Sequence, residues 1–227
     1  IRRPPRSTPS NSSAASDVYK RQLQKLPKEF ACVIIGPPLS GKKELLYNYV
    51  LQTLKKGEPV MFITTDASAE DVKKDMVKNK IFYGSYSTNL VFIDCYSHQA
   101  GNLVAETSDT KRISGPLALN EISIAISEIQ RHFYKRNPSH KVIFNSLSTL
   151  LMYSNPQMIG RFIQLMIAKI RKAGGGVFFT LEEGMHEQNV IVTIEHLMNA
   201  IIHVKKENGK VMVKADGIDG LDGWVEL

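Results

Sequence analysis

The hydrophobic pattern of the chain changes in a regular way from Leu23 onward. Short continuous apolar runs alternate with longer segments in which apolar residues recur every three or four positions. Continuous short runs are typical of strands buried on both faces, and the longer spacing is typical of amphipathic helices. The predicted strands are FACVIIG (30–36), PVMFITT (59–65), NLVFIDCYS (89–97), KVIFNS (141–146) and VFFTLEEG (177–184).

Helices are predicted between and after these strands. The segment 68–80 has Ser68 in the position of a helix N-cap, and the segment 98–116 is polar enough to predict a loop. Two strands joined at Asn208–Gly209 predict a hairpin over 200–217. The predicted helices cover 43–57, 68–80, 118–136, 155–176 and 189–199.

Alternating buried strands and helices predict an α/β fold. Such a chain forms a mostly parallel sheet with helices on both faces. The C-terminal hairpin then adds antiparallel strands at one edge. We find no internal repeat and no second domain boundary, so residues 23–227 are expected to form a single domain.

The first residues, 1–22, differ in composition from the rest. They carry five basic residues and one acid, so they contribute +4 to the net charge of +7 and leave +3 for the remainder. This Ser/Pro/Arg-rich stretch has almost no large apolar residues, so we expect it to be disordered. It also looks like the peptide produced when sequencing-adapter DNA is translated into a gene model, and we therefore exclude it from functional reasoning. The alternative is a basic arm that contacts nucleic acid.

The bulk composition is that of an ordinary globular protein. The chain has 227 residues, of which 43% are hydrophobic and 22% are charged. No apolar run approaches the roughly 20 residues that a membrane helix needs. Cys32 and Cys95 both lie in apolar runs, which favours two reduced core thiols in a cytoplasmic protein.

The segment GPPLSGKKELL, residues 36–46, resembles a phosphate-binding loop of the pattern G-x-x-x-x-G-K-[ST]. Gly36, Gly41 and Lys42 match, but Lys43 stands where a hydroxyl belongs. A buried strand precedes the loop and a helix follows it, so backbone N–H groups and the helix N-terminus can face a phosphate that Lys42 also reaches. The candidate nucleotide-binding residues are Gly36, Pro37, Pro38, Leu39, Ser40, Gly41, Lys42, Lys43 and Glu44.

Polar residues follow the other predicted strands at the same edge of the sheet. In an open parallel sheet, ligands bind beyond the carboxyl ends of the strands. Asp66, Asp94, Asn145, Thr180 and Glu182 come at or near those ends. We therefore expect them to lie along one rim with the loop.

The chain resembles the KaiC-like ATPases of the RecA superfamily, especially their short single-domain archaeal type. The segments IIGPPLSGKKELLYNYV, GEPVMFITTDASAEDVKKDM, LVFIDCYS, VIFNSLSTLL and GGGVFFTLEEG come in the family's order and spacing, and the match covers nearly all of 28–214. The resemblance implies a RecA-like core that binds ATP or ADP between the loop and the strand tips. It also implies assembly into homo-oligomeric or hetero-oligomeric rings or filaments with RecA-like paralogues.

Two departures from the family concern the metal. The family has Ser or Thr at the position of Lys43, where the hydroxyl binds Mg²⁺, and an aspartate, the Walker B acid, at the position of Asn145. Mg²⁺ prefers hard oxygen ligands and negative charge. A lysine and a neutral amide at these two positions make a role for Mg²⁺ doubtful and fast hydrolysis unexpected. The Lys43 ammonium either replaces part of the metal's charge or points into solvent.

Two further departures concern catalysis and assembly. The family has a Glu-Glu pair after the second strand, one of which activates water; here Asp66–Ala67 leaves Asp66 as the candidate catalytic base. The family's K-x-R near the end reaches a neighbour's phosphates; here Lys214 remains, but Asp216 takes the arginine position. The T-x-E pattern of the family assigns Thr180 and Glu182 as phosphate sensors.

These observations predict an ATP-binding protein that is a weak or inactive ATPase with a regulatory or assembly role. Two alternatives stay open: a residual ATPase that uses Asp66, and an interaction scaffold that binds no nucleotide. The sequence predicts no metal site built by the protein, since DCYSH (94–98) lacks the remaining ligands. Lysines along the hairpin, in HVKKENGKVMVK (203–214), favour a solvated edge over contact with nucleic acid.

Overall fold

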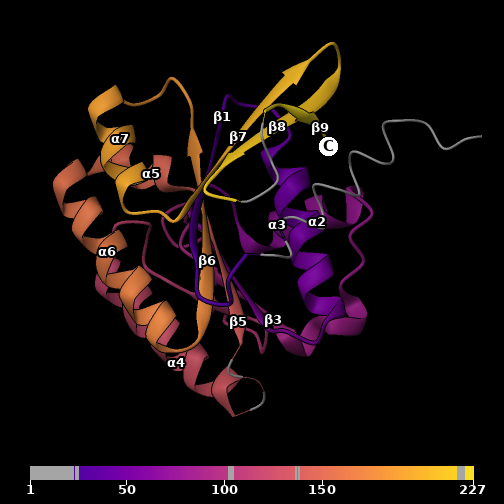
Figure 1. Ribbon diagram of the computed structural model, residues 1–227. Helices are drawn as coiled ribbons and strands as arrows, with labels where there is room; N and C mark the ends of the chain where they lie inside the picture. Colours follow the sequence, from indigo (N-terminus) through magenta and orange to yellow (C-terminus); the bar gives the residue numbers. More distant parts are fainter. Residues whose placement is uncertain (1–22, 24–25, 102–104, 136, 138, 219–222) are drawn as a thin grey trace, which may run out of the picture.

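A nine-stranded sheet runs through the molecule in the order β4-β3-β2-β5-β6-β1-β7-β8-β9 (Figure 1). The computed structural model describes residues 23, 26–101, 105–135, 137, 139–218 and 223–227, so the disorder predicted for 1–22 lies outside the described residues. The strands are β1 Ala31–Gly36, β2 Val60–Thr64, β3 Leu90–Asp94, β4 Thr110–Arg112, β5 His140–Asn145, β6 Gly175–Glu182, β7 Ala200–Glu207, β8 Lys210–Asp216 and β9 Val225–Glu226.

The strands from β4 to β7 are parallel, and β8 and β9 are antiparallel to their neighbours. The predicted α/β fold is therefore confirmed. The first strand of the predicted hairpin, β7, pairs in parallel with β1, so the antiparallel part begins only at β8. Asn208 and Gly209 join the two strands with positive φ angles of 51° and 78°, as the predicted tight turn requires.

Helices cover both faces of the sheet. In Figure 1, α4, α5, α6 and α7 lie on one side of it, and α2 and α3 lie on the other. Each group packs its apolar stripe into its own buried cluster, so the sheet is the shared wall between two cores. The helices are α2 Lys42–Lys55, α3 Ala69–Lys78, α4 Leu119–Tyr134, α5 Leu147–Tyr153, α6 Pro156–Lys172 and α7 Gln188–His196, with a 3₁₀ helix η1 at Gly84–Asn89.

Two predicted segments differ from the structure, and one helix was not predicted. The loop predicted for 98–116 contains β4, whose sequence TKR has no strand-like apolar pattern. The helix predicted for 155–176 ends at Lys172, because Gly175 and Gly176 already pair with β5 as the start of β6. A separate helix, α5, begins directly after β5, where Ser146 Oγ accepts a hydrogen bond from the Ser148 amide.

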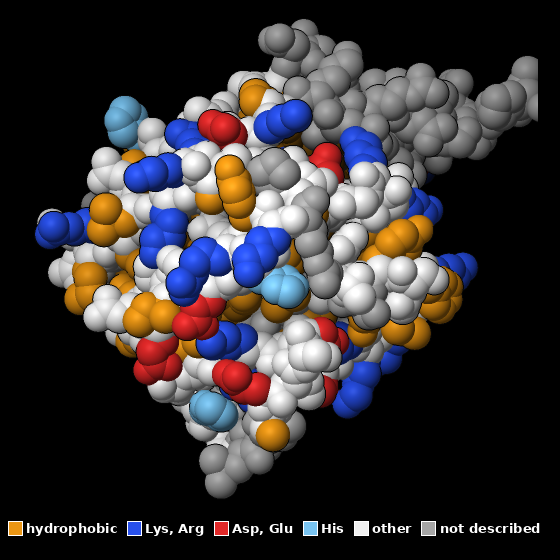
Figure 2. Space-filling view, turned by 90° about the horizontal axis from the view of Figure 1, so that it is seen from below, with side chains coloured by type: hydrophobic (Ala, Val, Ile, Leu, Met, Phe, Trp, Pro, Cys, Tyr) orange, Lys and Arg blue, Asp and Glu red, His pale blue; other side chains and the backbone are white. Residues whose placement is uncertain are grey.

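The face at the amino ends of the parallel strands carries lysine and arginine side chains interspersed with acidic ones (Figure 2). Several helices place basic residues in their last turn, among them Lys55 in α2, Arg131 in α4 and Lys172 in α6. Cations there offset the negative end of the helix dipole. The helix dipole thus explains why these basic residues lie at the helix C-termini, and no polyanionic partner is needed to explain them. No helix in the described part of the chain is both long enough and apolar enough to cross a membrane.

Candidate functional site

The loop between β1 and α2 lies where the sequence predicts a phosphate-binding loop. β1 ends at Gly36 and α2 begins at Lys42, with Gly41 as its N-cap residue. No side chain caps the first turn of α2. The first amides of a helix lack partners within the helix, so those of α2 are available to an anion that also gains from the helix dipole.

Both loop glycines meet a close neighbour. A Cβ atom on Gly36 would lie 2.2 Å from the carbonyl oxygen of Val204 in β7. Gly41 has a φ of 102°, and a Cβ atom there would lie 2.7 Å from a methyl group of Val211 in β8. The β7–β8 hairpin therefore packs directly against the loop, and this contact leaves no room for a side chain at either position.

Lys42 is folded back onto the loop. Its Nζ donates to the carbonyl oxygens of Gly36 at 2.6 Å and Pro37 at 2.7 Å, and it lies 3.4 Å from Ser40 Oγ. The carboxylate of Glu182, at the end of β6, accepts from the same ammonium at 3.0 Å. The sequence predicts that Lys42 reaches a phosphate bound at the loop, and the structure adds Glu182 as the counter-ion of Lys42.

Asn145 joins two other residues of the site. Its Nδ2 donates to Asp66 Oδ1 at 2.9 Å, and its Oδ1 accepts from the hydroxyl of Thr180 at 2.9 Å. Asn145 and Thr180 are both buried, at 8% and 2% exposure, so solvent has little access to this bridge. The three residues that the sequence placed at separate strand ends thus form one hydrogen-bonded chain.

Asp66 lies beside this bridge at the rim. The residue is solvent-exposed, yet protein surrounds its carboxyl closely enough to cost part of its hydration, and this raises its pKa. The positive charge of Lys43 and the hydrogen bond from Asn145 oppose that rise, and the negative charge of Glu182 adds to it. Lys43 is exposed and has no hydrogen-bond or ion-pair partner among the described residues. Its charge therefore acts on Asp66 through space.

These residues do not fit a magnesium site of the usual kind. The amide oxygen of Asn145 is already taken by Thr180, and the side chain at 43 is a cation. Within the described residues, no group of three or more His, Cys, Asp or Glu is arranged to hold a metal ion. Hard cations need several oxygen ligands, and the protein supplies few of them here.

The model of the KaiC ATPase family matches residues 20–220. This chain belongs to that family. A search of the curated proteins gives no match. The sequence resemblance to KaiC-like proteins with a RecA-like fold is confirmed.

Three solved structures share the fold of this chain. A KaiC-like protein of the archaeon Pyrococcus horikoshii superposes with a TM-score of 0.60 at 12% identity, over 88% of this chain and 90% of that one. A second P. horikoshii protein, solved with an unknown peptide, gives 0.68 at 14% identity over 88% of each chain. The flagellar accessory protein FlaH of Methanocaldococcus jannaschii gives 0.56 at 17% identity, over 89% and 83%.

Lys214, which the KaiC resemblance assigns to a neighbour's phosphates, is paired within its own chain. Its Nζ lies 3.3 Å from Asp216 Oδ1, and His203 Nε2 lies 3.6 Å from the other oxygen of the same carboxylate. Two other hairpin lysines are paired too: Lys205 with Glu207 at 3.0 Å and Lys210 with Glu226 at 2.7 Å. These pairs reduce the free positive charge of the hairpin.

Asp94 is a structural residue. The sequence placed it near the nucleotide, but its carboxylate is fully buried and accepts from the amides of Ala69, Tyr96 and Ser97 and from the hydroxyl of Ser97. Arg112 completes the set at 2.7 Å and also pairs with Glu70. Sequence reasoning missed Arg112 because it lies in β4, the strand that lacks a hydrophobic pattern.

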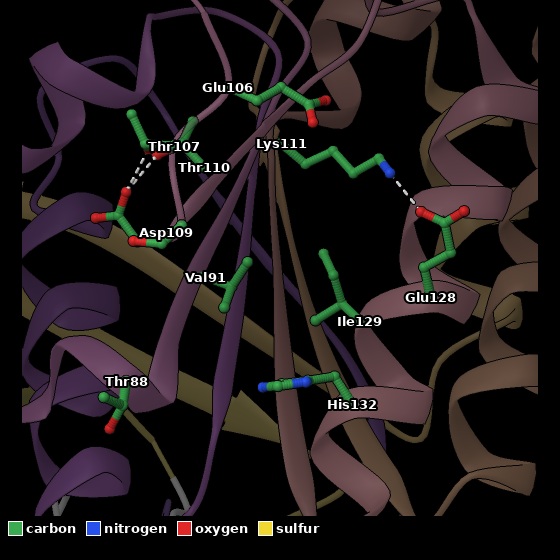
Figure 3. Close-up of a pocket in the computed structure, with 11 residues that line it drawn as sticks. Thr88, Val91, Glu106, Thr107, Asp109, Thr110, Lys111, Glu128, Ile129 and His132 are labelled. Atoms are coloured by element: carbon green, nitrogen blue, oxygen red, sulfur yellow. Dashed lines mark hydrogen bonds and ion pairs between the residues drawn. The ribbon is translucent and has the colours of Figure 1, made fainter.

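Larger hollows lie elsewhere on the described part of the molecule. One of about 580 Å³ lies along the β4 edge beside α4 (Figure 3). There Lys111 and Glu128 point toward each other and pair, and Asp109 accepts from Thr107 and Thr110. The hollow at the loop is smaller, about 250 Å³, and Asp75 and Asn79 of the α3 end also line it. The helix N-terminus and Lys42 still favour the loop as the candidate anion site.

Proposed function

We propose that this KaiC-family chain binds ATP or ADP at the 36–44 loop without help from magnesium. On this proposal it hydrolyses ATP slowly or not at all, and it serves as a regulatory or assembly subunit. The observation that carries the proposal is the Asn145 bridge. A neutral amide, fixed by Asp66 and Thr180, stands where the family places the carboxylate that supports the metal.

The loop itself supports binding. The uncapped N-terminus of α2 and the buried ammonium of Lys42 provide positive potential next to Gly41. Neither contribution requires a metal ion. Loss of the metal-supporting groups therefore affects hydrolysis more than binding, since phosphoryl transfer depends on a precisely placed cation to neutralise developing charge.

Residual ATP hydrolysis is a second candidate function, and Asp66 is the observation that favours it. Its carboxyl lies at the rim, hydrogen-bonded to Asn145, and partial loss of hydration raises its pKa, which makes it a stronger base than a free aspartate. Magnesium-dependent turnover that disappears in Asp66→Asn would support this candidate against the main proposal.

Calorimetric titration of ATP and ADP, in magnesium and in chelator, tests the main proposal. We expect similar affinities in both buffers and loss of binding in Lys42→Ala. An affinity gain of tenfold or more from magnesium, about 1.4 kcal/mol, would contradict metal independence. Binding that survives Lys42→Ala would show that the loop is not the site. No binding at all would favour a nucleotide-free scaffold.

A further inference from the structure

Glu182 is held in place beside the loop by its own backbone. It ends β6 in register with Gly36 of β1, and its amide donates to Ser148 Oγ at 2.8 Å. Its side chain is 26% exposed and meets the Lys42 side chain, which is 7% exposed. The carboxylate therefore lies at the mouth of the loop, with little freedom of its backbone to move away.

The Lys42 ammonium has no unused donor. A lysine ammonium has three N–H groups. Here four acceptors surround it: two loop carbonyl oxygens, the Ser40 hydroxyl and the Glu182 carboxylate. An entering phosphate must displace at least one of them, and Glu182 is the only charged one of the four.

The position of Glu182 matters most for the outermost phosphate. In loops of this pattern the backbone amides hold the inner phosphates, and the lysine reaches the outer ones. The Glu182 carboxylate, 3.0 Å from that ammonium, therefore competes with a third phosphate for the same cation. Asp66 is close enough for the two carboxylates to repel, since the charge of Glu182 contributes to the raised pKa of Asp66.

Little on the protein offsets this negative charge. A divalent cation would offset this charge, but the Lys43 ammonium and the Asn145 amide, whose oxygen is taken by Thr180, do not favour one here. The charge of Lys43 acts on Asp66. Among the residues that the structure describes, Glu182 pairs with Lys42 alone, the same cation that the outer phosphate needs.

We infer that Glu182 makes this loop select nucleoside diphosphates over nucleoside triphosphates. The inference rests on the proposed function, because it names the ligand preferred at the same site. A diphosphate keeps the amide contacts of the loop and places less charge against Glu182. A triphosphate brings its terminal phosphate against a carboxylate that competes with it for the Lys42 ammonium.

The test compares Glu182→Gln with Glu183→Gln, which removes the same charge from the exposed neighbouring residue. ADP and ATP are titrated into each protein in chelator, and circular dichroism confirms that each is folded. We expect the parent and Glu183→Gln to bind ADP at least tenfold more tightly than ATP. In Glu182→Gln the ratio should fall below about threefold because ATP binds more tightly.

Two outcomes would overturn this inference alone: equal affinity for ATP and ADP in the parent, or an unchanged ratio in Glu182→Gln. Loss of ADP binding in Glu182→Gln would also overturn it, since Glu182 would then assist binding. Absence of binding by both nucleotides in all three proteins would instead overturn the proposed function, and the inference with it.

Discussion

At the residue scale, the side-chain amide of Asn145 removes the negative charge that an aspartate would bring to this position. An aspartate at 145 would place a second carboxylate at about the distance of the present 2.9 Å contact to Asp66. Two carboxylates that close cannot both ionise without a cation between them. The amide instead donates to Asp66 and accepts from Thr180, so the site is satisfied without a metal.

Restoring the two metal-supporting side chains should make nucleotide binding depend on magnesium. We expect Lys43→Thr with Asn145→Asp to make ATP binding at least tenfold tighter in magnesium than in chelator. Each single change should do less, because both groups serve one ion and their effects do not add. Hydrolysis should return only in part, since Ala67 and Asp216 remain altered. Calorimetry of the parent, both single variants and the double variant measures this. Equal metal dependence in the double variant and the parent would refute this account of the site.

At the scale of elements, the β7–β8 hairpin packs against the start of α2. Gly41 has a positive φ, and Val211 of β8 lies against the position of its missing Cβ. Gly57, just beyond the other end of α2, also has a positive φ of 75°, but nothing lies within 4 Å of its missing Cβ. Both glycines have a left-handed backbone conformation, but only Gly41 also has a packing contact. Comparing the two positions therefore distinguishes the effect of conformation from that of packing.

Substitution of each glycine by alanine should show this difference. Gly57→Ala should lower the free energy of unfolding by about 1 kcal/mol, the cost of a left-handed conformation for a residue with a side chain. Gly41→Ala should cost about 1–3 kcal/mol more because Val211 must move, and it should weaken nucleotide binding. Urea denaturation and ATP titration measure the two effects. Equal destabilisation by both changes would show that the hairpin contact does not constrain the loop.

Charge pairing in the hairpin bears on assembly of the whole molecule. The KaiC resemblance implies that subunits complete a neighbour's site with a cation from this region. Here Lys214 is bound to Asp216 of its own chain, and Asp216 would itself repel a neighbour's phosphates. We propose that nucleotide drives a closed homomeric ring less strongly in this chain than in active family members, which favours assembly with an intact paralogue.

Light scattering of the purified protein tests this proposal. We expect the molar mass to be unchanged by ATP or ADP. Asp216→Asn, which frees Lys214, should increase any nucleotide-dependent association, whereas Glu207→Gln, which frees Lys205 instead, serves as the matched control. A stable hexamer of the parent that forms only after nucleotide is added would contradict the proposal.

The sequence by itself determined the fold class and the place of the loop. Buried strands such as β1 and β2 carry continuous apolar runs, and the helices carry a regular spacing of apolar residues, so local pattern and tertiary structure agree. The loop could be predicted from the sequence because Gly36, Gly41 and Lys42 all lie in one short segment. The glycines act through the backbone, and Lys42 acts through its ammonium group. Family membership follows from the same local features.

Only the tertiary structure decided which residues meet across the sheet. The pairing of Lys42 with Glu182 joins residues 140 positions apart, and the Asn145 bridge joins three different strand ends. β4 has no hydrophobic pattern, yet it pairs with β3, and its Arg112 reaches the buried Asp94. Such contacts depend on strand order and register, which arise from packing of the whole sheet, whereas periodicity reports only how each segment divides its own residues between core and solvent.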